Sequence, residues 1–450
     1  MSDAIFSQLD FGALNEFMDD DNVTDISYSN GGQIHLKTLD KGIMKVERPD
    51  INNALMEKLA FQCSNVMGKT FNMAHPFLDA EGAELRFNFV HDSIATNGIA
   101  CVIRKTPAKI RLNKQKLLDE DYINVSIHDF LMKCVEGHCN IIVAGETGSG
   151  KTELVKYLAS HTSVSEKIIS IEDTLELHLD RIYPNRDIVA MKTNNIASYS
   201  DVLVTCMRQN PIWILLSEVR SAEAVMAVRN SISSGHSILS TIHADKAESI
   251  PMRMYSLLEG NLDIDQYLTS IHRYVQLGIY VKGFFSKELN RFQRQIMEVC
   301  EFYVNDNNQA KSNVIFKRSL DGTISMKNPT KYLLEYMSIQ GIVLPPDTFG
   351  LGNVNSGDSS INAVTQKHEI PKTATAPTGT EEASSAPVAG ATPAQPTAGQ
   401  APVQPAVVAP VAAPAPQVPQ PAPVAAPVAP SPAPAPVAMP VPQSTNPQTA

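Results

Sequence analysis

A glycine-rich run that ends in lysine and threonine is the strongest chemical signal in the sequence. It consists of Gly145, Glu146, Thr147, Gly148, Ser149, Gly150, Lys151 and Thr152, and it matches the phosphate-loop pattern GxxxxGK[ST] in full. Glycines let backbone N–H groups turn toward an anion, and a following helix adds partial positive charge. We therefore predict a site for ATP with Mg²⁺. Lys151 would reach the β- and γ-phosphates, and the Thr152 hydroxyl would hold Mg²⁺.

Three polar segments follow predicted strands downstream of this loop, at residues 171–176, 214–220 and 234–244. The carboxyl ends of parallel strands meet at one edge of a sheet, where ligands bind. ATP hydrolysis needs one carboxylate to orient or polarise water and another to position Mg²⁺ through its water shell. Glu218 and Glu176 are the best candidates, with Glu218 expected to reach Mg²⁺ through water. A neutral histidine can sense the γ-phosphate by hydrogen bonding, and His243 is the candidate.

Each of these residues also has an ordinary structural explanation. Glu172 and Asp173 could cap a helix. Glu218 could pair with Arg220 on the surface, and His243 could be a hydrogen-bonded core residue. The complete phosphate loop upstream favours the chemical explanation over these.

The composition limits the possible classes of protein. The 450 residues include 37 basic and 47 acidic ones, a formal net charge of -10, so direct sequence-specific binding of nucleic acid is not expected. The first residues lack the pattern of a signal peptide, and no run of about 18 apolar residues suggests a membrane span. Six scattered cysteines are typical of reduced cytosolic thiols. Cys134 and Cys139 lack a second ligand pair, so zinc is not predicted.

The elements that must position the loop begin with a small α+β domain, predicted for residues 1–105. Alternating polarity around residues 29–32 predicts a hairpin, and residues 51–67 have helical spacing. Residues 106–125 are predicted to be a linker. The segment 104–116 contains six basic residues and no acidic one. It is either a solvated connector or a basic contact to phosphate or an anionic surface.

Residues 126–345 alternate helical patterns with short apolar runs, which predicts a parallel sheet wrapped by helices. Strands are predicted at residues 140–144, 167–171, 214–216, 237–242, 295–303, 314–320 and 323–326. Residues 346–450 are predicted to be a disordered tail, because residues 371–450 hold 21 of the 30 prolines and no aromatic residue. Such a Pro/Ala/Val-rich segment favours extended polyproline conformations. It is either an inert spacer or a docking tether for a partner.

Over residues 10–305 the chain resembles the type II/type IV secretion ATPase superfamily, most of all the conjugation, type IV secretion and Tad-pilus ATPases. The resemblance rests on the order and spacing of VTDI from Val23, GETGSGKT, IEDTLEL, SEVRSAEA, SGHSILSTIHA and RQIMEVCEF. It implies an α/β fold in which a RecA-like P-loop motor domain follows the small α+β domain. It also implies a hexameric ring, with nucleotide between the two domains of each subunit. The partners would be inner-membrane and coupling components of the machine, and the protein would be cytoplasmic and peripheral at the membrane.

The resemblance assigns further residues by motif. Glu176 belongs to the acidic segment, Glu218 to the Walker B segment and His243 to the histidine segment. Arg86 and Arg104 match arginines that approach the nucleotide from the N-terminal domain or a neighbour, as arginine fingers do. Arg208 matches another arginine, which precedes the Walker B strand and has a less certain role.

Three residues depart from the family pattern. Ser217 and Ser221 stand where glycine is usual, and Ile212 stands where aspartate is usual. The carboxylate of Glu218 is retained, so we expect hydrolysis, with slow turnover. The absence of a tetracysteine insert argues against the main type II secretion branch.

Three functions compete. The leading one is an oligomeric ring motor whose ATP hydrolysis powers protein or protein–DNA translocation, or pilus assembly. The second is a nucleotide-gated scaffold that does not hydrolyse ATP, with the tail recruiting partners. The third is a small-molecule kinase, which leaves the histidine segment and the N-terminal domain unexplained.

Overall fold

The computed structural model describes residues 9–82, 84–194, 196–258, 263–319, 321–352 and 366–367. Within these ranges, no helix is long and apolar enough to cross a membrane. Two sheets dominate the described chain, one antiparallel with six strands and one mixed with ten. The predicted disordered tail lies outside the described residues apart from its first seven positions and a two-residue strand, β16 (Gln366–Lys367).

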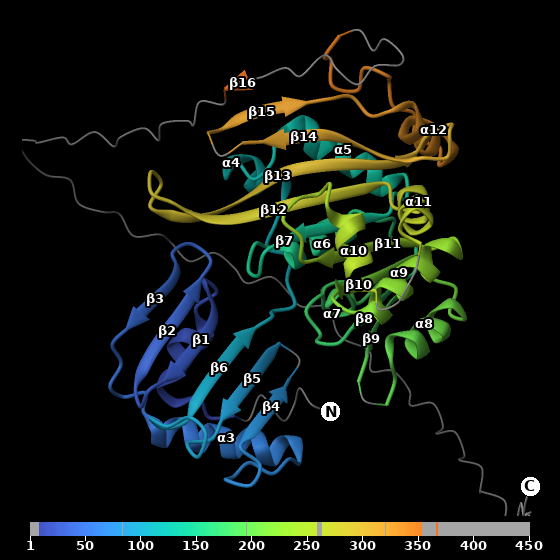
Figure 1. Cartoon of the computed structure of the whole chain (residues 1–450). Helices are drawn as coiled ribbons and strands as arrows, with labels where there is room; N and C mark the ends of the chain where they lie inside the picture. The colour runs from blue at the N-terminus through green and yellow to red at the C-terminus, as the bar shows by residue number, and fades with distance from the viewer. Residues whose placement is uncertain are drawn as a thin grey trace, which may run out of the picture. The chain divides into compact units, whose positions relative to one another are not determined.

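The antiparallel sheet lies in the segment that the sequence predicts to be the N-terminal domain and has the strand order β3-β2-β1-β6-β5-β4. Its elements are η1 (Gly12–Leu14), α2 (Asn15–Asp19), β1 (Val23–Ser29), β2 (Gln33–Thr38), β3 (Gly42–Val46), α3 (Asn53–Met67), β4 (Phe77–Glu81), β5 (Leu85–Val90) and β6 (Ala100–Lys105). Helix α3 lies across one face of this sheet (Figure 1). Alternation along the strands points apolar side chains toward that helix and leaves a polar face on the other side.

Helix α3 forms where its local signals predict it. Asn52 caps its first turn by accepting the backbone N–H of Leu55, and Gly68 ends it in the left-handed region with φ +60°. Met56, Leu59 and the residues that continue their helical spacing are buried against the sheet. The helix therefore gives the domain a core of its own.

The ten-stranded sheet is the core of the segment that the sequence predicts to be the P-loop domain. Its order is β16-β15-β14-β13-β12-β7-β11-β10-β8-β9, and the strands from β12 to β9 pair in parallel. The strands are β7 (Ile141–Gly145), β8 (Ile168–Glu172), β9 (Ile188–Lys192), β10 (Trp213–Val219), β11 (Ser237–Ile242), β12 (Leu277–Ser286), β13 (Arg291–Val304), β14 (Ala310–Arg318) and β15 (Thr323–Met326). They run from orange β15 to green β9 in Figure 1.

Helices cover both faces of this sheet, so its central strands are apolar on both sides. The helices are α4 (Lys114–Asp119), α5 (Val125–Glu136), α6 (Lys151–Ser160), α7 (Leu179–Ile182), α8 (Tyr199–Met207), α9 (Ala222–Ser233), α10 (Ile250–Ser256), α11 (Ile264–Tyr274) and α12 (Lys331–Ile339). Ile141 and Val143 of β7 join the core beneath α5 and α6, whereas Ile142 and Ala144 join the core beneath α8 to α11. Burial on two faces explains why these strands read as continuous apolar runs.

The structure confirms the α/β class and the parallel-sheet motor core. The RecA-like arrangement is visible in the strand order, because β11 lies between β7, which leads into the phosphate loop, and β10, which carries Glu218. The predicted strands 237–242 and 323–326 have the observed bounds, and the other strands predicted after residue 126 differ by a few residues at their ends.

Three strands and one helix differ from the sequence-based expectations. Strands β4, β9 and β12 were not predicted. Two glycines and a lysine interrupt the apolar pattern of β12, which is held as a strand by its pairing with β7 and β13. The predicted linker contains helix α4, because Asn113 caps it by accepting the N–H of Lys116.

Candidate active site

The phosphate loop connects the end of β7 to the start of α6 and has the backbone shape that its glycines predict. Gly145, Gly148 and Gly150 have φ angles of +156°, +81° and +96°, a region that side chains with a Cβ rarely occupy. A Cβ added to Gly145 would lie 2.4 Å from the carbonyl oxygen of Val281, far inside van der Waals contact. Glycine is therefore required at position 145 for the loop to take this shape.

Lys151, the first residue of α6, is almost completely buried under the loop. Its Nζ donates hydrogen bonds to the carbonyl oxygens of Gly145 at 2.9 Å and Glu146 at 3.0 Å. Burial lowers the pKa of Lys151, and the negative charges of Glu218 and Glu176 oppose that shift. An ammonium group that has lost most of its water gains strongly from a phosphate oxygen, because charge-assisted hydrogen bonds replace the lost hydration.

Glu176 lies next to the end of the phosphate loop. Its Oε2 accepts a hydrogen bond from the Thr152 hydroxyl at 3.2 Å. The buried carboxylate of Glu172 holds this segment in place. It accepts the backbone N–H groups of Glu176 at 2.8 Å and Leu177 at 3.1 Å, and the hydroxyl of Ser170 at 2.9 Å. Sequence reasoning gave Glu172 only a helix-capping role and missed its role as the anchor of Glu176.

The Walker B and histidine segments also meet, because β10 and β11 are paired neighbours that end together. His243 Nε2 lies 2.9 Å from Glu218 Oε1, and both side chains are partly exposed. The Thr241 hydroxyl donates to the carbonyl oxygen of Ser217 at 2.5 Å, which ties the two strand ends together. These residues therefore lie together at one edge of the sheet, as the sequence led us to expect.

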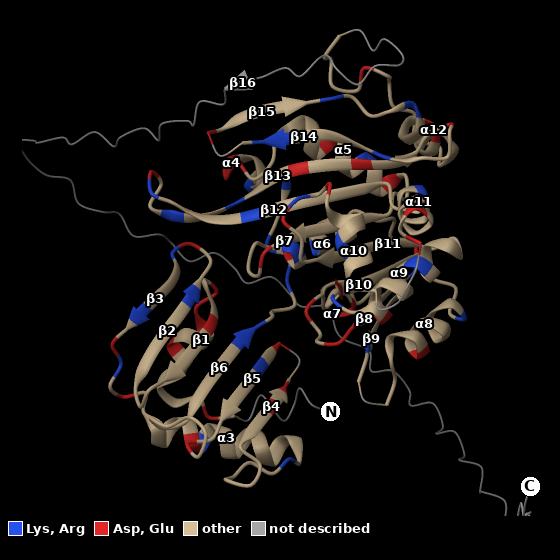
Figure 2. Ribbon diagram, viewed as in Figure 1, with Lys and Arg blue, Asp and Glu red and all other residues tan. Residues whose placement is uncertain are grey.

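Five charged residues form one row across the polar face of the N-terminal sheet. The strand register pairs Lys37 with Asp25, Asp25 with Arg104, Arg104 with Arg86, and Arg86 with Glu81. Residues directly opposite each other point to the same face of a sheet, so the row is a property of the pairing and not of any one strand. Figure 2 shows its basic members as blue bands on β2, β5 and β6.

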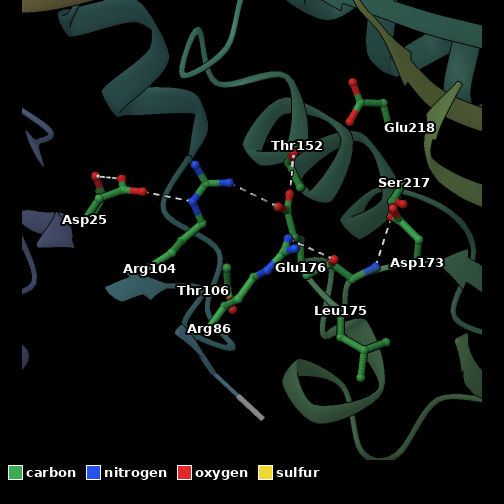
Figure 3. A network of polar contacts seen from close by, with 12 residues as sticks. Asp25, Arg86, Arg104, Thr106, Thr152, Asp173, Leu175, Glu176, Ser217 and Glu218 are labelled. Atoms are coloured by element: carbon green, nitrogen blue, oxygen red, sulfur yellow. Dashed lines mark hydrogen bonds and ion pairs between the residues drawn. The ribbon is translucent and has the colours of Figure 1, made fainter. Parts of the chain in front are cut away.

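This row contacts the segment that carries Glu176. Arg104 Nε donates to Asp25 Oδ1 at 2.8 Å, and its Nη1 lies 4.0 Å from Glu176 Oε1. Arg86 donates to the hydroxyl of Thr174 at 3.1 Å. Burial alone would lower the pKa of Arg104, but the hydrogen bond and charge of Asp25, together with Glu176, raise it overall. Figure 3 shows Asp25, Arg104, Glu176 and Thr152 joined by consecutive contacts.

Two further cations flank the phosphate loop, and sequence reasoning identified neither. The Lys37 ammonium approaches Gly148 so closely that a Cβ there would lie 2.6 Å from its Nζ. Arg294 of β13 packs against Gly150, donates from Nε to the carbonyl oxygen of Gly148 at 3.4 Å, and donates from Nη1 to that of Leu39 at 3.1 Å. No local motif marks these residues, because they are distant in sequence and reach the loop only through tertiary packing.

These groups line a pocket of about 270 Å³. Nine lysines and arginines line it, against five aspartates and glutamates, in a chain whose net charge is -10. The pocket is therefore locally positive, as a site for several phosphate groups must be. Among the described residues, no cluster of three His, Cys, Asp or Glu side chains could hold a metal alone. The hydroxyl and carboxylates present suit Mg²⁺ that binds together with phosphates.

A second pocket of about 350 Å³ adjoins the first. The two share Leu39, Arg111, Gly150, Glu153 and Arg294. Beyond the shared residues the second pocket has three apolar or aromatic lining residues, Leu112, Tyr122 and Phe292, and seven charged or polar ones, Asp21, Asn22, Asp40, Lys116, Glu120, Arg291 and Gln293. A ligand with phosphates at the loop could thus extend a flat, apolar group into the adjoining space.

Two arginines named in the sequence analysis, Arg208 and Arg220, have the following surroundings. Arg208 is exposed at the end of α8 and lies outside the lining of this pocket. Arg220 forms an ion pair with Asp173 and not with Glu218. The Glu218 carboxylate therefore faces His243 and the pocket.

Two curated proteins are similar to this chain in sequence. A curated, uncharacterized protein of Bacillus anthracis is 29% identical over 293 residues, which cover 63% of this chain and 66% of that protein. The type IV secretion system protein VirB11 of Bartonella quintana is 33% identical over 199 residues, 40% of this chain and 54% of that protein. The chain thus spans about half to two thirds of the length of these two relatives.

Two solved structures also overlap with the chain. The VirB11 ATPase of the Brucella suis type IV secretion system is 22% identical, with coverage of 66% of this chain and 93% of that one and a TM-score of 0.35. The ATPase DotB of Legionella pneumophila is 16% identical, with coverage of 61% and 77% and a TM-score of 0.46. The family described as Type II/IV secretion system protein matches residues 80–307, which is half of the sequence, and the chain belongs to that family.

Proposed function

We propose that this protein is an oligomeric ATPase that powers movement of protein or protein–DNA complexes through a type IV secretion or conjugation machine, or the assembly of a pilus. The observation that carries the proposal is the convergence of Glu176, Glu218 and His243 on one phosphate loop. A site that only bound nucleotide would need no more than the phosphate loop and Lys151. The added carboxylates and histidine are what hydrolysis requires.

The proposed chemistry assigns a role to each group. Lys151 binds the phosphates. Thr152 and Glu218 hold Mg²⁺, which neutralises phosphate charge when bound. Glu218, acting on Mg²⁺ through water, and Glu176, next to Thr152, position the metal and the attacking water between them. The 2.9 Å contact of Glu218 with His243 supports a histidine that responds to the γ-phosphate. Arg104 stabilises the charge that develops during transfer, and Asp25 keeps it positioned.

The adjoining pocket combines aromatic and apolar side chains with polar ones, which suits the adenine base. Its aromatic wall includes Phe292, whose ring lies 4.9 Å from the guanidinium carbon of Arg294. Because the two pockets share Gly150, a base stacked there would allow the phosphates to lie at Gly150 and the rest of the phosphate loop. This arrangement also supports nucleotide binding between the N-terminal and motor domains, since Leu39 belongs to the former.

The hexameric assembly and the membrane partners are proposals that rest on family membership and on the type IV secretion relatives. Arg208 is exposed in this subunit, so any catalytic role for it would be at the site of a neighbour. The inner-membrane and coupling components of the machine would place the protein at the cytoplasmic face of the membrane.

The test is Mg²⁺-dependent phosphate release by the purified protein at several protein concentrations, beside Lys151→Ala and Glu218→Gln. We expect specific activity that rises with concentration and is lost in both variants. Glu218→Gln should retain ATP binding, because its phosphate-binding groups are unchanged, whereas Lys151→Ala should lose it. Tight ATP binding by an assembled wild-type protein that releases no phosphate would favour a nucleotide-gated scaffold, which the Ser217 and Ile212 departures would then explain.

A further inference from the structure

Arg111 lies at the boundary between the phosphate pocket and the adjoining pocket, and it lines both of them. It belongs to the basic segment 104–116, between Ile110 and Leu112, which pack against the core on one face of the ten-stranded sheet. The backbone at Arg111 is therefore held to that core on both sides. Sequence alone leaves open whether the basic segment is a solvated connector or a contact to phosphate.

The guanidinium group of Arg111 contains buried donors that lack acceptors. Its Nε and Nη2 atoms are shielded from solvent, and neither has a hydrogen-bond partner among the described residues. Burial lowers the pKa of Arg294, and the like charge of Arg111 contributes to that lowering. Leaving a buried charged donor without an acceptor is unfavourable. An anion at this boundary would satisfy the Arg111 donors and offset the repulsion between the two arginines.

Glu153, the third residue of α6, presents the opposite kind of group at the same boundary. Its Oε1 lies 3.4 Å from the Nζ of Lys156, whose side chain is buried. Its Oε2 is shielded from solvent and accepts no hydrogen bond from the part of the chain that the structure describes. The contact with Lys156 thus orients the carboxylate and leaves one oxygen to accept a hydrogen bond from a ligand.

The hydroxyl of Tyr122 is a third buried polar group without a partner among the described residues. It lies 4.0 Å from the position that a Cβ on Gly150 would take, so it is close to the phosphate loop. Tyr122 lines the adjoining pocket together with Arg111 and Glu153, and we call these three residues the boundary cluster. The cluster offers donors, an acceptor and a hydroxyl that can act as either.

A phosphate group alone would match only part of the boundary cluster. Its oxygens would accept from Arg111, but its negative charge would be repelled by Glu153. A ribose hydroxyl, by contrast, donates to a carboxylate, and the α-phosphate beside it accepts from a guanidinium. A nucleotide with its base in the adjoining pocket and its terminal phosphates at the loop has its ribose and α-phosphate between the two. That is where the boundary cluster lies.

We propose that the boundary cluster binds the ribose and α-phosphate of the nucleotide and makes the site selective for ribonucleotides. Glu153 accepts a ribose hydroxyl through Oε2, and Arg111 donates to the α-phosphate. The inference rests on the proposed binding of ATP and adds specificity for its sugar. A sugar without hydroxyls would leave the Glu153 carboxylate buried without a donor, and such sites reject the analogue that lacks the hydroxyl.

The experiment measures binding of ADP and of 2′,3′-dideoxyADP to the full chain with Mg²⁺ by isothermal titration calorimetry. Both nucleotides keep the α-phosphate, and only ADP has ribose hydroxyls. We expect wild type to bind ADP about tenfold more tightly than the dideoxy analogue. Equal affinities would overturn the ribose contact, and this comparison needs no variant. Failure of wild type to bind either nucleotide would instead contradict the proposed ATP site, and this inference with it.

Glu153→Ala should lower the affinity for ADP about tenfold without lowering that for the dideoxy analogue, so the preference disappears. Glu153→Gln, which fills the same space, should reduce the preference less, because its neutral oxygen is a weaker acceptor. Glu136→Ala is the matched control: it also removes the partner of a lysine three residues away on a helix, Lys133, and it lines neither pocket. A full preference for ADP in a folded Glu153→Ala protein would overturn the role of Glu153.

Arg111→Ala should weaken binding of ADP and of the dideoxy analogue equally, by about tenfold, because both nucleotides keep the α-phosphate. Lys109→Ala is its control, because Lys109 lies two positions earlier, pairs with Asp21 and lines neither pocket. Melting temperatures would establish that each variant is folded. Unchanged affinity of a folded Arg111→Ala protein for both nucleotides would overturn the α-phosphate contact.

Discussion

Replacing Glu172 by alanine would test whether this buried carboxylate fixes the position of Glu176. One carboxylate oxygen accepts the backbone N–H groups of Glu176 and Leu177, and the other accepts the Ser170 hydroxyl. An unsatisfied buried donor costs about 1–3 kcal/mol, so two of them should cost about 2–4 kcal/mol after local relaxation. That is well above the ~0.5 kcal/mol typical of a surface substitution.

The assays are thermal unfolding and steady-state ATP hydrolysis on the same preparations. At about 2–4 °C per kcal/mol for a domain of this size, Glu172→Ala should lower Tm by roughly 5–15 °C. The value of kcat should fall about tenfold while KM changes less, because Glu176 loses its backbone anchor but the phosphate loop is intact. Glu172→Gln is the matched control, because its amide oxygen can still accept both N–H groups and most of the stability should remain.

Glu172 also predicts a pH dependence. Burial raises its pKa, against the lowering effect of the hydrogen bonds from Glu176, Leu177 and Ser170. The folded protein therefore binds this proton more tightly than the unfolded chain does. Stability should fall as pH rises from the ordinary carboxyl range to the raised pKa, and stay level above it. Glu172→Gln should lack that fall, which a comparison of Tm across this pH range would detect.

Two results would refute this reasoning. The first is a Glu172→Ala variant whose Tm matches wild type within about 1 °C and whose kcat matches within about twofold, since the buried donors would then have other partners. The second is a Glu172→Gln variant as damaged as alanine. In that case the negative charge, and not the hydrogen-bond acceptor, would be what the segment needs.

Two further substitutions test the phosphate loop and the charged row. Gly145→Ala should abolish binding of a fluorescent ATP analogue, because its Cβ would lie 2.4 Å from the Val281 oxygen. Gly235 also has a positive φ, +87°, but open space around it, so Gly235→Ala should bind normally. Retained binding in Gly145→Ala would show that the loop tolerates a Cβ. Asp25→Asn should lower kcat about tenfold without raising KM, because Arg104 loses the partner that orients it while the pocket gains positive charge. An unchanged kcat, measured beside Arg104→Ala, would contradict a positioning role for Asp25.

Local signals in the sequence determined the phosphate loop and most of the central strands. A complete GxxxxGK[ST] pattern between an apolar run and a helical one has few other meanings. Strands buried on both faces are read directly from their apolar runs, as for β7 and β11. The acidic and histidine segments could also be predicted to meet, since parallel strands bring their carboxyl ends to one edge.

Only the tertiary structure decided which other charges reach the loop. Lys37 and Glu81 join the row of Asp25, Arg86 and Arg104 through strand register, which single-strand patterns do not specify between distant segments.

The strand β12 and the contacts of Arg294 follow the same rule. Glycines interrupt the apolar sequence pattern of β12, and pairing with β7 holds this segment as a strand. Arg294 lies 146 residues from Gly148 in the chain. It reaches the phosphate loop because β13 pairs with β12, and β12 pairs with β7, the strand that leads into the loop. Local sequence thus determined where phosphate binds, and long-range pairing decided which side chains surround it, because free energy from pairing and burial outweighs the weak local preferences of those residues.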